Sequence, residues 1–295
     1  MGTGSSKSRA KHGDYQHVHV LVVVKVRQST TTPMLCPGVW GALWRPHQPI
    51  NAWRADAVFA SRGEDDERGA WTFPDRPPPD AWELGWKDLR LKARLAAFRH
   101  MGLFPEHSTH WTWAMSRTRS AGPGLRALNL FGYTGAMSLA LASAGAEVTH
   151  LDASPKAIAQ GRENQALSGL AERPVRWICD DAMSFIRREQ RRGRTYDAVI
   201  LDPPKYGRGP KGEIWKFEAD FPELLGAVRT LLSDRPVFVI ATVYAVRLSW
   251  LSVSQALEGA LTGMGGSVSA GEMAIRERSG RLLPTGLFAR WESGA

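Results

Sequence analysis

Short apolar runs alternate with helix-like segments through the second part of the sequence, and this alternation limits the fold more than any other feature. The runs expected to form strands are Ala127–Phe131, Val148–Leu151, Val175–Cys179, Asp197–Leu201 and Val237–Ala241. Strands that alternate with helices at this spacing form a parallel sheet with helices on both faces. Such α/β sheets bind ligands at the carboxyl ends of their strands, so functional residues are expected at those ends.

The helices between these strands carry recognisable start and stop signals. Ala136–Ser143 is an apolar helical segment. Ser154 is followed by Pro155, which is the pattern of an N-cap with proline in the first turn, and this helix is expected to end before Gly169. Two further helices are expected, from about Ala182 to Gly193 and from about Phe221 to Leu232.

The first part of the chain differs from the rest. Residues 1–33 are predicted to be a disordered extension, with Met34 as an alternative start. Residues 34–105 are rich in Trp and Pro and are expected to form a small β-rich N-terminal domain. Its tryptophans are expected in its core rather than exposed for stacking on bases. Residues 106–295 are predicted to form the α/β domain.

Composition sets limits on partners and compartment. The net charge of +9 indicates a polyanionic partner, although the basic start of the chain and the preference for Arg over Lys offer another explanation. No apolar run approaches the ~20 residues that span a bilayer, so no membrane segment is expected. Cys36 and Cys179 lie far apart, which excludes a disulfide framework and favours a reducing, cytoplasmic compartment. The histidines are scattered, so no metal site is predicted.

A glycine loop follows the first strand, with the sequence Asn129-Leu130-Phe131-Gly132-Tyr133-Thr134-Gly135. Two glycines three residues apart let the backbone turn tightly beneath a ligand. On their own they fit a plain strand–helix turn equally well. Dinucleotide-binding folds use the longer G-x-G-x-x-G pattern, whereas this shorter loop suits a cofactor without a pyrophosphate. The loop therefore favours S-adenosylmethionine.

Acidic residues follow the next two strands. Asp152, twenty residues after Gly132, is expected to accept hydrogen bonds from the two ribose hydroxyls; a turn or helix-capping role is the alternative. Asp180 or Asp181, after the third strand, is placed to meet the adenine amino group. Asp181 is favoured because it opens the next helix with Ala182, where it would also act as the N-cap.

The fourth strand ends in Asp202-Pro203-Pro204-Lys205-Tyr206, the most specific motif in the chain. Two prolines directly after a buried strand fix the backbone and thereby the Asp202 carboxylate. Such rigidity suits a group that orients a planar nitrogenous substrate beside a methyl donor. A lone Asp-Pro-Pro is a common turn, but here it follows three other candidate sites in strand order.

Together, these segments resemble class I S-adenosylmethionine-dependent methyltransferases over about residues 95–245. The glycine loop and the Asp-Pro-Pro-Lys-Tyr motif are similar to the large-subunit ribosomal RNA methyltransferase family, whose members modify cytosine C5 or guanine N7. The resemblance implies a Rossmann-like sheet, S-adenosyl-L-methionine as cofactor and RNA as substrate. The implied cofactor-binding residues are Phe104, Glu106, Asn129, Phe131, Gly132, Tyr133, Thr134, Gly135, Asp152, Ala153, Asp180, Asp181, Ala182 and Asp202. The implied catalytic residues are Asp202, Pro203, Pro204, Lys205 and Tyr206.

The segment from His100 to His107 is similar to the one that precedes the catalytic domain in this family and lies over the cofactor. By that resemblance Phe104 and Glu106 approach the methionine end or the adenosine. Pro105 and Glu106 stand where relatives often have Leu and Asp. For Phe104, ordinary interdomain core is the alternative.

A polar, basic stretch follows the Asp-Pro-Pro motif. Its cations are Lys205, Arg208, Lys211 and Lys216, and its aromatic residues are Tyr206 and Trp215. A flexible cationic loop beside the transfer site would hold phosphates while an aromatic ring stacks on an extruded base; an ordinary solvated loop is the alternative. The basic run Arg187–Arg194 is interpreted as a solvated helix face.

The chemistry of the acceptor atom is only partly constrained. Cytosine C5 is a poor nucleophile and normally needs a cysteine to add at C6 first. The segment Val239–Tyr244, which is placed to supply one, contains no cysteine, and Cys179 is interpreted as structural. Transfer to nitrogen or oxygen, or to C5 by another route, remains open.

Three hypotheses follow. The leading one is a methyltransferase that modifies a base in RNA, with ribosomal RNA favoured. The second is a methyltransferase that acts on a small molecule or a protein, and the third is a non-catalytic RNA-binding protein with a vestigial cofactor site. The sequence predicts no particular oligomeric state.

Overall fold

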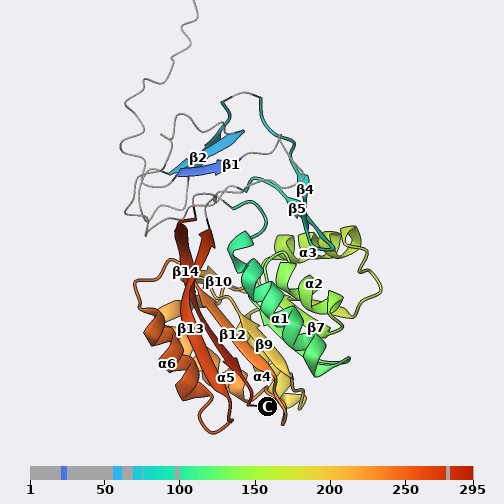
Figure 1. The fold of residues 1–295 in the computed structure, drawn as a ribbon, viewed down its shortest axis with the longest axis vertical. Helices are drawn as coiled ribbons and strands as arrows, with labels where there is room; N and C mark the ends of the chain where they lie inside the picture. The colour runs from blue at the N-terminus through green and yellow to red at the C-terminus, as the bar shows by residue number, and fades with distance from the viewer. Residues whose placement is uncertain are drawn as a thin grey trace, which may run out of the picture.

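The computed structural model describes residues 21–24, 56–61, 69–74, 76–96, 100–276 and 280–294. Its strands are β1 Leu21–Val24, β2 Ala57–Ser61, β3 Gly69–Thr72, β4 Trp82–Trp86, β5 Leu89–Ala93, β6 Arg126–Leu130, β7 Glu147–Asp152, β8 Val175–Cys179, β9 Ala198–Leu201, β10 Tyr206–Arg208, β11 Ile214–Lys216, β12 Phe238–Val243, β13 Ser267–Arg276 and β14 Leu282–Glu292. Its helices are the 3-10 turn η3 Pro105–His107, α1 Ser108–Ala121, α2 Ala136–Ser143, α3 Pro155–Leu167, α4 Ala182–Arg191, α5 Phe217–Arg229 and α6 Trp250–Ala260. Figure 1 shows their arrangement.

The centre of the molecule is a seven-stranded sheet in the order β13-β14-β12-β9-β6-β7-β8. The five strands predicted from the sequence pair in parallel, from β12 through β9, β6 and β7 to β8. This confirms the predicted Rossmann-like α/β fold. β14 pairs antiparallel with both β12 and β13. The sheet is therefore mixed, because β13 and β14, which were not predicted from the sequence, extend the five parallel strands at one edge.

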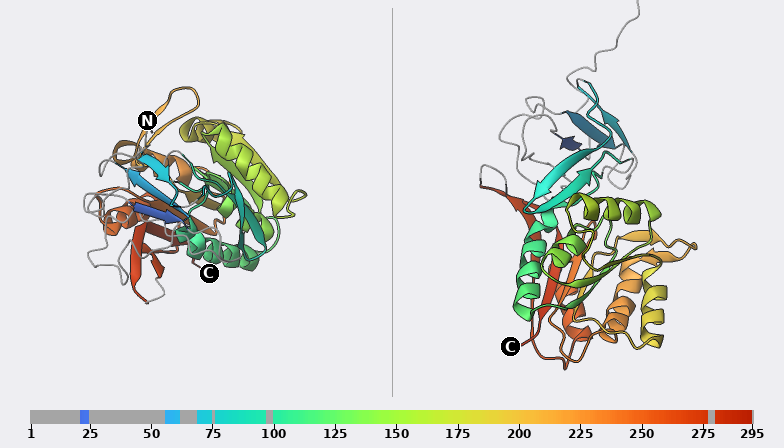
Figure 2. Two further views of the ribbon diagram at one scale, coloured as in Figure 1. Left: turned by 90° about the horizontal axis from the view of Figure 1, so that it is seen from above. Right: turned by 90° about the vertical axis from the view of Figure 1, so that its right-hand side faces the viewer.

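Helices cover both faces of the sheet (Figures 1 and 2). One face packs on α4, α5 and α6, with Phe185, Leu224 and Val253 in a common apolar cluster with the strands. The other face packs on α1 and α2, where Trp111 and Leu139 belong to a second cluster. The central strands β9 and β12 are buried along their whole length because both faces of the sheet are covered in this way.

Two small β structures precede the central sheet. β1, β2 and β3 form an antiparallel sheet, and β4 and β5 form a hairpin. β1 lies within residues 1–33, the segment predicted to be a disordered extension; the remainder of that segment is outside the described part of the chain, and the assignment stays a prediction. Trp40, Trp44 and Trp53 are also outside it, whereas Trp82 and Trp86 pack against the second apolar cluster.

The hairpin packs directly against the α/β core. Leu89, Leu91 and Ala93 of β5 belong to the same apolar cluster as α1 and α2. One core therefore includes residues from both sides of the boundary predicted at residues 105/106, and this boundary stays a prediction. In Figures 1 and 2 the hairpin lies beside α3, near the carboxyl ends of the parallel strands. Within the described residues, no helix has the length and apolar character of a membrane span.

Candidate functional site

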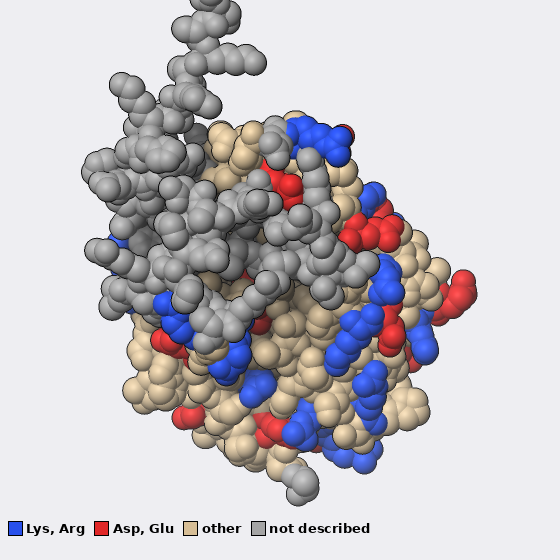
Figure 3. Space-filling model, turned by 45° about the horizontal axis from the view of Figure 1, so that its top comes forward, with Lys and Arg blue, Asp and Glu red and all other residues tan. Residues whose placement is uncertain are grey.

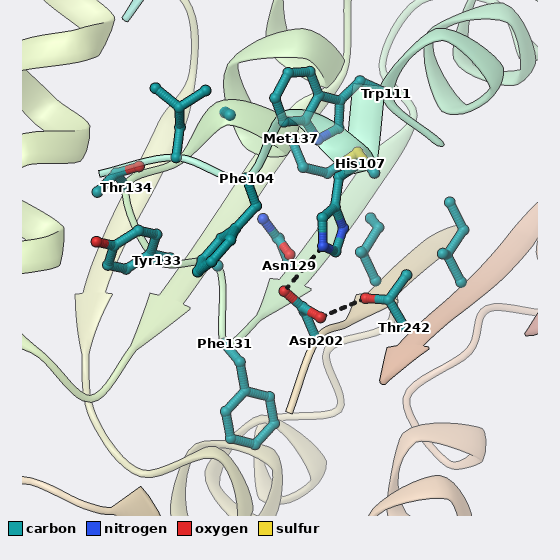
Figure 4. A pocket seen from close by; sticks show the side chains of 15 residues that line it. Phe104, His107, Trp111, Asn129, Phe131, Tyr133, Thr134, Met137, Asp202 and Thr242 are labelled. Carbon is teal, nitrogen blue, oxygen red and sulfur yellow. Dashed lines mark hydrogen bonds and ion pairs between the residues drawn. The ribbon is translucent and has the colours of Figure 1, made fainter. Parts of the chain in front are cut away.

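A cavity opens at the carboxyl ends of β6, β9 and β12, where an α/β sheet is expected to bind its ligand. Figure 4 shows side chains from these strand ends, the glycine loop and the segment before α1 facing into it. The residues that line it are Leu103, Phe104, His107, Trp111, Asn129, Phe131, Gly132, Tyr133, Thr134, Ala136, Met137, Ile200, Asp202, Ile240 and Thr242. Seven of the predicted site residues are in this set, namely Phe104, Asn129, Phe131, Gly132, Tyr133, Thr134 and Asp202.

The glycine loop has an unusual backbone. Phe131 and Tyr133 have φ angles of 58° and 50°, which side-chain-bearing residues rarely adopt, and Gly135 begins α2 with a φ of 86°. Gly132 has no room for a side chain, because a Cβ atom there would lie 2.6 Å from His150 Nδ1 and 2.8 Å from Asn129 Nδ2. Residues held in sparsely populated backbone conformations concentrate at ligand sites, so the loop geometry is typical of a binding loop.

Three buried polar side chains, linked by hydrogen bonds, support the glycine loop. Asn129 Nδ2 donates to Ser138 Oγ at 2.9 Å, and Ser138 Oγ lies 2.8 Å from His150 Nδ1. Burial lowers the pKa of His150 to about 3, so its ring is neutral at physiological pH. The Asn129 side chain is therefore engaged in holding the loop, although its position is at the cavity.

The Asp152 carboxylate fixes the loop from the end of β7. Its two oxygens accept hydrogen bonds from the backbone N–H groups of Tyr133 and Ser154, each at 2.8 Å. Burial raises the pKa of Asp152, and these two N–H donors oppose that effect. Each carboxylate oxygen can accept further hydrogen bonds. Asp152 is next to the cavity rather than in its lining, and its role toward ribose stays a prediction.

Asp181 is the N-cap of α4, as expected. Its Oδ1 accepts the N–H of Ser184 at 2.8 Å. Asp180 forms an ion pair with Arg188. Ala182 is buried in the first turn of α4, and the Ala153 carbonyl accepts a weak bond from the Cys179 thiol at 3.6 Å. None of these residues lines the cavity, and their contact with a cofactor stays a prediction.

Backbone and side-chain contacts hold Asp202 at the cavity. Its backbone N–H reaches the Leu130 carbonyl at 3.4 Å, and Pro203 follows it directly. Thr242 Oγ1 donates to Asp202 Oδ1 at 2.6 Å, and His107 Nε2 lies 3.8 Å from Asp202 Oδ2. Both contacts are drawn in Figure 4. The side chain is 21% exposed, so its carboxylate is fixed but open to a ligand.

Phe104 and Glu106 lie on the segment that enters α1. The Phe104 ring is in the cavity lining, 5.4 Å from the Tyr133 ring and 6.2 Å from the His107 ring. Glu106 Oε2 is buried and has no hydrogen-bond partner among the described residues. Burial raises the pKa of Glu106, His107 opposes this, and the charge of Asp202 adds to it.

The basic stretch after the motif is a β-hairpin, so the prediction of a flexible loop is wrong. β10 and β11 pair antiparallel, and Trp215 is buried, with its Nε1 donating to the Pro204 carbonyl at 2.6 Å. The Trp215 ring also packs 5.3 Å from Phe131. Trp215 is therefore an anchor and is not available for base stacking, whereas Tyr206 is 51% exposed. Pro203, Pro204, Lys205 and Tyr206 do not belong to the cavity lining.

The sequence did not identify Thr242 as a site residue, and it gave His107 no role beyond its place in the segment from His100 to His107. Thr242 follows Ala241, which pairs with Leu201, so it stands beside Asp202 in the sheet. The sequence held a signal for it, because Thr242 is the one polar residue of the otherwise apolar, buried strand β12. His107 had none, since only the docking of η3 against the strand ends brings it to Asp202.

A sulfonium cofactor fits the charges of this site. Burial raises the pKa of the Glu106 and Asp152 carboxyl groups, and the charge of Asp202 raises both pKa values further. Three acidic groups gathered around a cavity are stabilised by a bound cation. The partnerless Glu106 oxygen and the tight backbone at Gly132 are consistent with a ligand that completes the site.

Comparison with known proteins gives consistent results. Residues 51–239 match a family described as S-adenosylmethionine-dependent methyltransferases. The crystal structure of the SAM-dependent methyltransferase from Agrobacterium tumefaciens is similar, with a TM-score of 0.81, 46% identity, and coverage of 86% of this chain and 82% of that one.

Two curated relatives match over shorter stretches. The Ribosomal RNA large subunit methyltransferase K/L of Shewanella frigidimarina is 31% identical over 146 residues, which is 49% of this chain and 20% of that protein. The Ribosomal RNA large subunit methyltransferase I of Shewanella denitrificans is 37% identical over 84 residues, which is 28% of this chain and 21% of that protein. The chain thus spans about one fifth of the length of these relatives. On the family match, the Agrobacterium structure and the geometry of the site, the chain belongs to the S-adenosylmethionine-dependent methyltransferase family.

Proposed function

We propose that this chain transfers a methyl group from S-adenosylmethionine to a base in RNA, with ribosomal RNA as the favoured substrate. The observation that carries the proposal is the Asp202 carboxylate, fixed by Thr242 and the strand exit yet open to the cavity. The names of the two Shewanella relatives support RNA as the substrate class.

The residues around the cavity have separate tasks in this proposal. The backbone from Gly132 to Gly135 and the carboxylates of Asp152 and Glu106 would hold the cofactor, with Phe104 covering it. The bound cofactor supplies an already activated methyl group. The protein then needs mainly to align the acceptor and exclude water, which the apolar lining of Trp111, Met137 and Ile240 favours.

Asp202 would orient the acceptor by accepting a hydrogen bond from its N–H. Covalent activation of a pyrimidine C5 requires a thiolate. No cysteine occurs among the described residues that line the cavity, and Cys179 is exposed at the end of β8. Partial burial and then the charges of Asp152 and Asp180 raise the pKa of its thiol. Nitrogen is therefore the proposed acceptor.

The outer face of the β10–β11 hairpin favours a single-stranded nucleic acid. Tyr206 pairs with Lys216 and Arg208 pairs with Ile214 in the antiparallel register, so all four side chains share one face, and all four are exposed. An aromatic ring between cations is the arrangement that stacks on bases and neutralises phosphates. The hairpin is fixed to the Asp-Pro-Pro motif, since the Phe217 N–H donates to the Lys205 carbonyl at 3.0 Å.

A second exposed group follows the neighbouring strand. Leu248, Trp250 and Leu251 are 40%, 41% and 48% exposed and follow β12, which is parallel to β9. The segment that contains them therefore starts at the same edge of the sheet as the hairpin, where the parallel strands have their carboxyl ends. Elsewhere, Lys and Arg lie in several groups with Asp and Glu among them (Figure 3), so net charge alone does not define an RNA-binding face. The support for RNA comes from these two aromatic-bearing segments beside the site.

The test uses tritiated S-adenosylmethionine and ribosomal RNA from cells that lack the gene. Wild-type protein is expected to label this RNA but not RNA from cells that carry the gene. Asp202→Ala is expected to abolish labelling while calorimetry shows nearly unchanged cofactor binding. Undetectable cofactor affinity in the wild type would favour a vestigial site, and labelling of a small molecule or protein in a lysate, with none of the RNA, would overturn the choice of substrate.

A further inference from the structure

We infer that His107 takes up, through Asp202, the proton that the acceptor loses on methylation, and that the acceptor atom therefore carries a proton before the transfer. This inference rests on the proposed function and narrows it to one class of acceptor atom. His107 would receive the proton from Asp202 and would not itself contact the methyl donor.

The two oxygens of Asp202 have different surroundings. Oδ1 accepts the hydroxyl of Thr242 at 2.6 Å, and this bond fixes the plane of the carboxylate. Oδ2 faces His107 Nε2 at 3.8 Å. This separation is too long for a direct hydrogen bond, but bonds of this kind often shorten when the substrate is bound. Oδ2 thus faces both the cavity and a base.

His107 is well placed to accept a proton from Asp202. Its side chain is 13% exposed, and it is the only basic side chain among the described residues that line the cavity. Figure 4 shows its ring pointing at Asp202 from the segment that enters α1. A protonated imidazole there would remain paired with the Asp202 carboxylate.

The neighbours of His107 favour this role. Glu106 precedes it, with a buried oxygen that has no partner among the described residues, so a second polar group lies beside His107 at the cavity. His110, whose ring lies 6.4 Å away, does not compete for the proton. Burial, then the charges of His107 and Arg290, lower the pKa of His110 to about 3.

The proton balance restricts the acceptor to an atom that carries a proton. When an amino nitrogen forms its bond to the methyl carbon, the bond from that carbon to sulfur breaks and its electron pair stays on sulfur. The nitrogen then carries one proton too many, which passes to Asp202 Oδ2 and on to His107 Nε2. A ring nitrogen such as guanine N7 has no proton to lose, so a relay would have no task there. An exocyclic amine gives the Asp202–His107 pair a role.

The experiment compares His107→Ala and His107→Gln with wild type on the same ribosomal RNA from cells that lack the gene. Both variants are expected to lose roughly 100-fold in kcat, as for removal of a general base. Affinity for S-adenosylmethionine, measured by calorimetry, is expected to stay unchanged. Added imidazole is expected to restore much of the rate of His107→Ala, but none of the rate of His107→Gln, whose side chain fills the space, or of Asp202→Ala.

Mass spectrometry of the nucleosides made by the wild type supplies a second readout. A methyl group on an atom that carried a proton, such as an exocyclic amine, is expected; one on a ring nitrogen without a proton, such as guanine N7, would overturn the inference but leave RNA methylation intact. Wild-type rates in His107→Gln, or a failure of imidazole to rescue His107→Ala, would also overturn it. If the wild type labels no RNA at all, the proposed function itself has failed.

Discussion

Gly132 shows how a single residue links the sequence motif to the binding loop. Its neighbours His150 and Asn129 fill the space that a Cβ atom would need, and both are buried. The sequence predicted a tight turn here, but not the reason that makes glycine obligatory. That reason is a contact with β7, which no local pattern contains.

Gly132→Ala is therefore expected to destabilise the protein by about 1–3 kcal/mol, since overpacked sites force their neighbours to shift, and to weaken S-adenosylmethionine binding at least tenfold. Chemical denaturation and calorimetry measure the two effects. Gly226→Ala is the matched control, because Gly226 lies in α5 with open space around it. It is expected to leave cofactor affinity unchanged; equal effects of the two variants would contradict the argument.

Thr242 gives the next prediction at this scale. Thr242→Val keeps the shape but removes the hydroxyl that donates to Asp202. Hydrogen bonds to charged groups contribute about 1.5–3 kcal/mol, so kcat is expected to fall roughly 10- to 100-fold with little change in cofactor affinity. Steady-state labelling of RNA measures it.

Thr118→Val is the control for that variant. The Thr118 hydroxyl in α1 is buried and has no hydrogen-bond partner among the described residues. Its removal is expected to be neutral or slightly stabilising and to leave kcat unchanged. If Thr242→Val also kept the wild-type rate, the hydroxyl would have no part in orienting Asp202.

At the scale of elements, the sequence predicted the parallel strands and their helices well. α2 and β8 have the predicted bounds, because apolar runs with clear stop signals define them locally. α5 runs from Phe217 to Arg229 rather than from about Phe221 to Leu232, with Pro222 inside the helix. β13 was missed because its apolar–polar alternation is weak: its sequence mixes small and polar residues with apolar ones, and only Met273 is buried.

The junction between β5 and α3 is an element-scale feature that no motif predicts. Asn164 of α3 accepts the Lys92 N–H of β5 through Oδ1 at 2.8 Å and donates through Nδ2 to the Thr134 carbonyl of the glycine loop at 2.9 Å. One turn earlier, Gln160 donates to the Lys92 carbonyl at 2.8 Å. The side chains of α3 thus take the place of a neighbouring strand along β5 and couple it to the loop.

Asn164→Ala is expected to cost about 1–3 kcal/mol, because it leaves a buried N–H and a buried carbonyl unpaired, and to weaken cofactor binding. Ser168→Ala provides the comparison, since Ser168 bonds the Arg90 backbone nearer to solvent and far from the loop. It is expected to cost less than about 1 kcal/mol and to leave affinity unchanged. Urea denaturation and calorimetry test both, and unchanged affinity in Asn164→Ala would refute the coupling.

Two buried histidines, His110 in α1 and His150 in β7, make the stability of the folded protein depend on pH. His110 packs 4.9 Å from the Phe288 ring, and burial lowers the pKa of His110 and of His150 to about 3 from 6.5. Below pH 6.5 the unfolded chain binds these protons and the folded protein does not. The stability contribution is therefore full above pH 6.5 and is lost as pH falls toward 3, by about 1.4 kcal/mol per unit for each residue.

His110→Phe is expected to reduce this loss by about 2 kcal/mol at pH 5, relative to pH 7.5. The raised pKa values of Glu106 and Asp152 act in the opposite direction, with stability lost as pH rises through the acid range. They are common to both proteins, so the difference between wild type and variant isolates His110. Urea denaturation at the two pH values measures it, and parallel pH curves would contradict the assignment.

At the scale of the whole molecule, the sequence suggested a domain boundary that the packing crosses. Composition changes near residue 105, but Leu89, Leu91 and Ala93 of β5 share one apolar cluster with α1, α2 and the sheet. Composition reports which residues a segment contains and not which core it joins. The β4–β5 hairpin is expected to unfold together with the α/β domain for this reason.

Leu91→Ala tests that cooperativity, because Leu91 is 2% exposed within the shared cluster. The cavity it creates is expected to cost about 2–5 kcal/mol, seen in calorimetry as one transition at lower temperature. Leu167→Ala is the control, since Leu167 is 39% exposed and its loss is expected to cost less than about 0.5 kcal/mol. Because a ligand that binds only the folded state stabilises it by about 2.7 kcal/mol at 100 times its Kd, S-adenosylmethionine is expected to raise that single transition in Leu91→Ala. A separate early transition that the cofactor does not shift would mean that the hairpin folds apart from the domain whose site it adjoins.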